Sequence, residues 1–252
     1  MNSVAIGIIP ARYASSRLPG KPLAMIRGKS MIQRVYEQAK KSESLSDVWV
    51  ATDNYRIVDA VNAFGGKVVM TSESCLSGTD RCAEAFRNLS LNTEIVVNIQ
   101  GDEPFVQPEQ IDQIVGLMKK TNADIGTLGS RIQNPEAIFN PNVVKLTKSS
   151  DGKALYFSRN PIPYVRGEDH SLWFEKAIFF RHLGMYSYRS ALLPELAGLS
   201  QSPLELAENL EQLRWLEAGY SIYIAETPFE SIGIDTPEDL EWVEKNWENL
   251  QP

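Results

Sequence analysis

Apolar runs and amphipathic patterns alternate along the first half of the chain. Short runs rich in β-branched residues predict strands over 4–9, 47–53 and 67–70, and a fourth run begins at Glu94. Helical periodicity between and after these runs predicts helices over 31–42, 55–64, 80–89 and 108–120. Strands that alternate with helices are typical of βαβ units, and strands that are apolar on both faces fit a sheet covered on both sides. We therefore predict an α/β fold in which helices flank a mostly parallel sheet.

The pattern changes between about residues 125 and 190. Longer β-rich runs follow one another there: DIGTLGSRI, VVKLTKS, KALYFSR and HLGMYSYR. They predict a smaller β-rich subdomain, an antiparallel layer that could cover a substrate or contact a second subunit. Neither a repeat nor a low-complexity tract interrupts the chain, so we predict a single domain over 1–252 with this subdomain inside it.

Helical periodicity returns near the C-terminus. LELAENLEQLRWLEAG predicts one helix over 204–219, ended by Gly219 as a C-terminal cap. Its apolar face would consist of Leu206, Leu210, Leu213 and Leu216. YSIYIAE then predicts a strand. The closing helix would have Thr236 as its N-cap, Pro237 as its first residue and Asp239 in a capping-box position.

Composition narrows the classes of partner. The chain has 252 residues, 43% of them hydrophobic, and a formal net charge of −7. Net acidity argues against nucleic acid as a partner, because phosphate-backbone binding needs an extended basic surface. Cys75 and Cys82 are expected to be free thiols. With no signal-peptide pattern and no apolar run of about 20 residues, we expect a cytoplasmic protein without a membrane partner.

The loop after the first predicted strand concentrates positive charge. IIPARYASSRLPGKPL carries Arg12, Arg17 and Lys21, together with Ser15 and Ser16. It is not a P-loop, because Pro follows Gly-Lys where Ser or Thr is required. In open α/β sheets ligands bind beyond the carboxyl ends of the strands, so this loop could surround a polyphosphate with cations and backbone N–H groups. For the loop alone, three solvated surface cations are the competing interpretation.

Two aspartates follow β-rich runs in the same way. Asp102 lies in QGDEP at the end of the fourth run, and Asp235 lies in GIDTPEDL before the closing helix. Together they offer two carboxylates for one magnesium ion opposite the cationic loop, as a nucleoside triphosphate would need. The alternative is an acidic turn at Asp102 and a residue flanking an N-cap at Asp235.

Nine motifs stand in order along nearly the whole chain: IPARYASSRLPGKPL, ATD, SGTDR, NIQGDEP, FNPNVVK, YFSRNPIP, RHLGMYSYR, SPLELAENLEQLR and IGIDTPEDL. In this ordered set the chain resembles the 3-deoxy-manno-octulosonate cytidylyltransferase family, the CMP-Kdo synthetases. The related sialic acid cytidylyltransferases match the middle and late motifs far less well. The resemblance implies a Rossmann-like nucleotidyltransferase sheet, with the β-rich subdomain serving sugar binding and dimer contact.

The resemblance also implies a reaction and its residues. CTP and 3-deoxy-D-manno-octulosonate (Kdo) would give CMP-Kdo and pyrophosphate for lipopolysaccharide biosynthesis, with Mg²⁺ as cofactor. Arg12, Lys21, Asp102 and Asp235 would be catalytic, the two aspartates as metal ligands. The implied CTP-binding residues are Arg12, Arg17, Lys21, Ser77, Gly78, Arg81 and Gln100. The implied sugar-binding residues are Arg159, His182, Glu211 and Gln212.

Each sugar-binding candidate has a structural alternative. Arg159 could bind the sugar carboxylate with a planar fork or form a buried salt bridge. His182 could be a core histidine satisfied by hydrogen bonds, and Glu211 and Gln212 could lie on a solvated helix face. Ser77 or Thr79 could also serve as the N-cap of the helix after SGTDR.

The sequence also leaves alternative functions open and indicates an oligomeric state. Cytidylyl transfer to 8-amino-Kdo or a sialic acid is the nearest alternative. A glycosyltransferase would usually carry Asp-x-Asp, which Asp102-Glu103-Pro104 does not match, and a nucleotide-sensing pseudoenzyme would be favoured by loss of charged residues that are present here. The family resemblance implies a homodimer, for which we expect Trp173, Phe174, Phe179 and Phe180 to provide exposed contacts.

Overall fold

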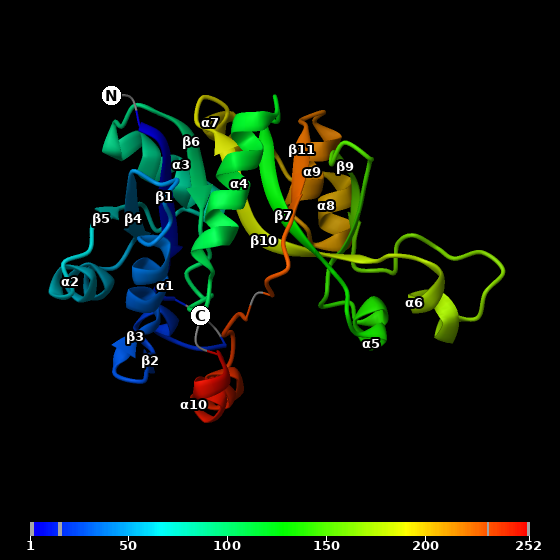
Figure 1. The fold of residues 1–252 in the computed structure, drawn as a ribbon. Coiled ribbons are helices and arrows are strands. Elements are labelled where there is room, and N and C mark those ends of the chain that lie inside the picture. Colours follow the sequence, from blue (N-terminus) through cyan, green and yellow to red (C-terminus); the bar gives the residue numbers. More distant parts are fainter. Residues whose placement is uncertain (1–2, 15–16, 231, 251–252) are drawn as a thin grey trace.

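A nine-stranded sheet forms the centre of the computed structural model, which describes residues 3–14, 17–230 and 232–250. Its strands are β1 (Ser3–Ala11), β4 (Asp47–Thr52), β5 (Val68–Met70), β6 (Thr93–Asn98), β7 (Ile125–Arg131), β8 (Lys145–Lys148), β9 (Ala154–Ser158), β10 (Phe180–Arg189) and β11 (Ile222–Glu226). Seven of them lie in the order β11-β7-β10-β6-β1-β4-β5 (Figure 1). β10 runs antiparallel to β6 and β7, whereas the other neighbours in this order are parallel. The predicted mostly parallel α/β sheet is confirmed.

Helices cover both faces of this sheet. They are α1 (Met31–Ala39), α2 (Tyr55–Ala63), α3 (Gly78–Leu89), α4 (Pro108–Lys120), α5 (Pro135–Phe139), α6 (Trp173–Lys176), α7 (Leu193–Gly198), α8 (Pro203–Glu208), α9 (Gln212–Glu217) and α10 (Pro237–Leu250). The buried side chains of α1, α2 and α4 form one core, and those of α3, α7 and α9 form another. Alternate residues of β1 supply both: Ala5 and Ile9 face the first core, and Ile6 and Ile8 face the second.

The β-rich stretch from 125 to 190 is continuous with the central sheet. β7 and β10 lie inside it, and β8 pairs with β10 and with β9. The strands pair antiparallel, as expected, but β7 and β10 do not form a layer of their own. Local patterns could not show this, because β10 reaches its neighbours β6 and β7 through pairings with segments distant in the sequence.

The single helix predicted over 204–219 is wrong, because two short helices occupy this stretch. Asn209 adopts a left-handed conformation with φ 52° and ends α8, and α9 starts at Gln212. Asparagine tolerates this conformation better than most residues. Leu206 is therefore 64% exposed rather than part of an apolar face. Gly219, with φ 88°, follows α9 as the predicted cap.

An arm built from α5, α6 and the connecting segments projects from the body of the molecule (Figure 1). The expected exposure of its aromatic residues is wrong for Trp173 and Phe179, which are buried in a small core with Ile132 and Ile138. Phe174 and Phe180 are half-buried. The exposed apolar side chains of the arm are instead Phe139, Tyr164, Leu172 and Ile178.

A second small core, called the C-terminal core below, joins the C-terminal helix to the beginning of the chain. Val243 and Ile234 pack with Ile26, Met31 and Phe105. Ile26 belongs to a hairpin of β2 (Met25–Ile26) and β3 (Lys29–Ser30), which follows the short 3₁₀ helix η1 (Lys21–Leu23). A second 3₁₀ helix, η2 (His170–Leu172), precedes α6. The opening loop, the turn after β6 and the approach to α10 are thus held together.

Two further expectations concern the thiols and the membrane. Cys75 and Cys82 are free, as predicted. Burial, followed by the hydrogen bond to Glu84, raises the pKa of Cys75 to about 11. In the described part of the chain, none of the helices is long and apolar enough to cross a bilayer.

Candidate functional site

A pocket of about 390 Å³ opens beyond the carboxyl ends of β1 and β6. Its lining contains every residue implied for CTP and metal binding: Arg12, Arg17, Lys21, Ser77, Gly78, Arg81, Gln100, Asp102 and Asp235. Pro10, Ala11, Pro22, Cys75, Leu76 and Gly101 complete it. Ser15 and Ser16 of the opening loop lie outside the described residues. The fold therefore brings four separate segments of the sequence to one place.

Lys21 joins the two aspartates at the centre of this pocket. Its Nζ donates to Asp102 Oδ2 at 2.6 Å and to Asp235 Oδ1 at 2.9 Å. Burial alone would lower the pKa of Lys21, but the two carboxylates raise it above its ordinary value. Arg17 lies 3.2 Å from Asp235, and Arg12 is exposed nearby. Three cations thus share the site with two carboxylates, which suits a strongly anionic ligand.

Backbone contacts around the C-terminal core place these groups. Gly20 has φ 69° and donates to the carbonyl of Tyr13, which turns the loop back before Lys21. Ile234 N–H donates to the carbonyl of Asp102 at 2.9 Å. This bond sets the residue before Asp235 directly against Asp102, although the two are far apart in the sequence.

The first turn of α3 forms another wall of the pocket. Ser77, one of the two N-cap candidates offered by the sequence, is its N-cap and forms a capping box with Asp80. Gly78 packs against Pro10 of β1 and Asn98 of β6. Gly101 lies still closer to β1, because a Cβ there would be 2.8 Å from the carbonyl oxygen of Pro10. Close backbone packing therefore shapes this side of the pocket.

Arg81 lines the pocket but is already engaged by other side chains. It is 3% exposed, donates to Asp53 Oδ2 at 2.7 Å and to Thr71 Oγ1 at 2.6 Å. These contacts tie α3 to the segments that follow β4 and β5. The placement of Arg81 near the cytosine and ribose stays a prediction. Its guanidinium fixes the position of α3, whose first turn forms this wall of the pocket.

The four sugar-binding candidates lie outside this pocket lining. Gln100 links the pocket to β10, because its Nε2 donates to the carbonyl of Gly184 in that strand at 2.8 Å. His182 lies on the same strand. Their assignment to the sugar stays a prediction.

Among the described residues, Arg159 does not form the buried salt bridge considered from the sequence. Its Nε, Nη1 and Nη2 donate to the carbonyls of Glu208, Pro141 and Asn209, respectively. The Glu208 carboxylate instead accepts from the Arg159 backbone N–H and the Ser158 hydroxyl. A guanidinium has five N–H donors, so one remains on each terminal nitrogen.

His182 is held by neighbours on the sheet. Its Nε2 lies 2.9 Å from Thr127 Oγ1, and its ring contacts Phe157 and Tyr186. The residue as a whole is half-buried, while its ring is enclosed by these groups. Burial lowers the pKa of His182 to about 3, so the ring is neutral near pH 7.

Glu211 and Gln212 lie at the beginning of α9. Gln212 is buried, and its Nε2 has no acceptor among the described residues. Burial raises the pKa of Glu211, against the opposing hydrogen bonds from Ser77 and Thr79. The solvated helix face considered from the sequence is therefore wrong for both residues, because the break at Asn209 turns the start of α9 inward.

The donor set at the pocket fits a magnesium ion. Mg²⁺ is commonly held by one or two carboxylates, with water and substrate phosphates completing its coordination. Asp102 and Asp235 face one point, since a single ammonium bonds both, and that ammonium marks a position where the carboxylates attract positive charge. Within the described ranges no cluster of three or more His, Cys, Asp or Glu could hold a metal. The remaining ligands would therefore come from substrate and water.

Sequence reasoning missed Cys75, Leu76 and Gly101 as parts of this pocket. Leu76 is 87% exposed, which is unusual for a leucine, but exposure is not readable from the sequence. Gly101 had a signal, because it precedes Asp102 in a sharp turn after a strand. Thr79 and Tyr188 lie beneath the pocket wall, and the sequence gave no signal that these two side chains would meet.

Comparisons with known proteins agree with this architecture. The Cytidylyltransferase family model matches residues 6–227. The 3-deoxy-manno-octulosonate cytidylyltransferase of Parabacteroides distasonis is 53% identical over 94% of this chain and 95% of its own, and that of Cytophaga hutchinsonii is 50% identical over 95% and 96%. A solved CMP:2-keto-3-deoxy-manno-octonic acid synthetase complexed with CTP has a TM-score of 0.90 at 42% identity, covering 98% of this chain and 99% of its own. A Leptospira borgpetersenii cytidylyltransferase, at 18% identity and a TM-score of 0.61, shares the fold.

Proposed function

The chain belongs to the 3-deoxy-manno-octulosonate cytidylyltransferase family, and we propose that it transfers the cytidylyl group of CTP to Kdo and releases pyrophosphate. The observation that carries the proposal is the single pocket in which the opening-loop cations meet Asp102, Asp235 and the first turn of α3. A related structure was solved with CTP, which supports CTP as the nucleotide.

The chemistry would be an in-line displacement at the α-phosphorus. The 2-hydroxyl oxygen of Kdo would bond to phosphorus and release its proton to water, while the bond from phosphorus to the pyrophosphate oxygen breaks and pyrophosphate leaves. An anionic sugar must approach a highly charged nucleotide, so neutralisation and positioning are the main tasks of the protein. Arg12, Arg17 and Lys21 would neutralise the phosphates, and Ser77, Gly78 and Gln100 would bound the nucleoside end.

Asp102 and Asp235 would hold magnesium beside these phosphates. When bound, the ion would withdraw charge from the phosphate oxygens. Lys21 would then exchange part of its contact with the two carboxylates for contact with phosphate, which its flexible stem permits.

The sugar would lie between β10 and the start of α9. Arg159 would offer its two remaining terminal N–H groups to the Kdo carboxylate. The neutral His182 and Gln212 would face hydroxyl groups. The contact of Gln100 with Gly184 supports this placement, because it joins the nucleotide pocket to the strand that carries His182.

We further propose that two copies assemble through the arm. Tyr164 and Ile178 are 70% and 57% exposed, and Phe139 and Leu172 are also exposed on the same projection. An exposed apolar group of this size is a common feature of interfaces between subunits.

The test is pyrophosphate release by the purified protein with CTP, Mg²⁺ and Kdo. We expect release that depends on Kdo and exceeds that with 8-amino-Kdo or a sialic acid. Release equal to a Kdo-free control would overturn the assignment of Kdo, and faster release with another sugar acid would reassign the acceptor.

A further inference from the structure

A series of buried hydrogen bonds runs beneath the wall formed by the first turn of α3. It contains Tyr188 in β10, Thr79 in α3 and Glu211 at the start of α9. We propose that Thr79 and Tyr188 are positioning residues which, through Glu211, hold Ser77 and Gly78 in place for CTP. The inference rests on the proposed function only in taking CTP as the ligand of the pocket.

The Glu211 carboxylate, at one end of this series, fixes the direction in which its hydrogen bonds donate. Thr79 Oγ1 donates to Glu211 Oε2 at 2.9 Å. A hydroxyl has one proton to donate, so Thr79 must accept from the Tyr188 hydroxyl, 3.2 Å away. Both hydroxyl protons of this series therefore have one place, and rotation of the Thr79 side chain would break its bonds to Glu211 and to Tyr188.

Thr79 and Tyr188 act from outside the pocket. They are 1% and 0% exposed, and neither belongs to the pocket lining. Ser77 does line the pocket, and its hydroxyl accepts from the N–H of Asp80 within the same turn of α3. Glu211 thus receives the hydroxyl of Thr79, which directly follows Gly78 in the turn that carries both Ser77 and Gly78.

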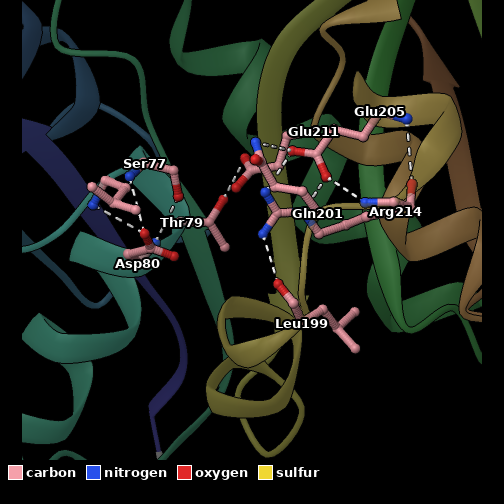
Figure 2. A network of polar contacts seen from close by, with 10 residues as sticks. Ser77, Thr79, Asp80, Leu199, Gln201, Glu205, Glu211 and Arg214 are labelled. Carbon is pink, nitrogen blue, oxygen red and sulfur yellow. Dashed lines mark hydrogen bonds and ion pairs between the residues drawn. The ribbon is translucent and has the colours of Figure 1, made fainter. Parts of the chain in front are cut away.

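The start of α9 is itself anchored. One turn beyond Glu211, Arg214 forms a two-bonded ion pair with Glu205 of α8 and donates to the carbonyl of Leu199 at 3.0 Å. Figure 2 shows this group on one side of Glu211, with Ser77, Thr79 and Asp80 on the other. Glu211 therefore connects the ion-paired helices α8 and α9 to the first turn of α3.

Isothermal titration calorimetry with CTP and Mg²⁺, without sugar, tests the proposal. Thr79→Val removes both bonds of the hydroxyl and should raise the Kd for CTP about tenfold or more, since a bond to a charged group is lost. Thr79→Ser keeps the hydroxyl and should stay within about threefold of the wild type. Thr93→Val is the matched control, because Thr93 is also buried, at 5% exposed, but lies at the start of β6, whereas the pocket lies beyond the carboxyl end of this strand. Its Kd for CTP should not change.

Unchanged CTP affinity in Thr79→Val, or an equal loss in Thr79→Ser and Thr93→Val, would overturn the proposal. Should Thr79→Val fail to fold, Tyr188→Phe takes its place, because it removes one hydroxyl and leaves the bond between Thr79 and Glu211. Tyr188→Phe should weaken CTP binding severalfold, and wild-type affinity would contradict the inference. Since no sugar is present, failure of transfer to Kdo does not affect this measurement.

Discussion

Arg214→Met should destabilise the protein strongly, because it leaves a buried carboxylate without its partner. The side chains of Arg214 and Glu205 are only 11% and 7% exposed. The change removes two bonds to the Glu205 carboxylate and the bond to the carbonyl of Leu199. Removing one partner of a buried ion pair costs about 3–5 kcal/mol. In a protein of this size, that loss lowers Tm by roughly 6–20 °C.

The pH dependence gives the prediction a second signature. Burial alone would raise the pKa of Glu205, but the bonds from Arg214 lower it below its ordinary value of 4.5. A group with a lowered folded-state pKa stabilises the protein above its unfolded pKa, and this contribution disappears as pH falls through the folded value. The difference in stability between wild type and Arg214→Met should therefore be full near pH 7 and shrink below about pH 4.5.

Denaturant unfolding followed by circular dichroism measures both effects. Lys245→Met is the control, since Lys245 and Glu241 form a well-exposed pair and the free energy of unfolding should hardly change. The double variant Glu205→Leu with Arg214→Met should recover part of the loss, because no charge is then left unpaired. A loss below about 1 kcal/mol in Arg214→Met, or one independent of pH, would refute the reasoning.

Three further predictions address other parts of the molecule. His182 should show no NMR titration between pH 5 and 8, because burial lowers its pKa to about 3; a transition near 6.5 would contradict this. Ile178→Asp together with Tyr164→Asp should convert a dimer to monomers in sedimentation experiments, whereas Tyr55→Asp, exposed on α2, should not; a dimer that persists would exclude the arm. Gly101→Ala should cost about 1–3 kcal/mol and weaken CTP binding, because its Cβ would meet the carbonyl oxygen of Pro10. Gly116→Ala in α4, with open space around it, should be neutral or stabilising, and equal behaviour of the two variants would refute the steric account.

Local periodicity was sufficient for most of the first half of the fold. The helices predicted over 55–64 and 108–120 correspond to α2 and α4, because their apolar positions recur at the helical period. Errors arose where one residue's backbone conformation or a distant pairing decides the structure. The left-handed Asn209 splits a helical pattern, and β10 enters the sheet by pairing with distant strands.

The convergence of the predicted site residues on one pocket was predictable because parallel strands end at a shared edge. Asp102 follows β6 and the cationic loop follows β1, so the rule for open α/β sheets brings them together. Asp235 was paired with Asp102 because it also follows a β-rich run, but the contact itself depends on the C-terminal core and on the bond from Ile234 to Asp102. The contacts of Arg159 with three carbonyls depend on loop geometry, which no spacing in the sequence encodes.

The most direct test of the proposed reaction compares pyrophosphate release from CTP, Mg²⁺ and Kdo by the wild type, Asp102→Asn and Asp235→Asn. Each substitution keeps the shape of the side chain but removes the charge that Lys21 now bonds and that magnesium would need. We expect each variant to lower kcat by about a hundredfold or more while its circular dichroism spectrum is unchanged. A near-wild-type rate in either folded variant would contradict a metal-dependent transfer in this pocket.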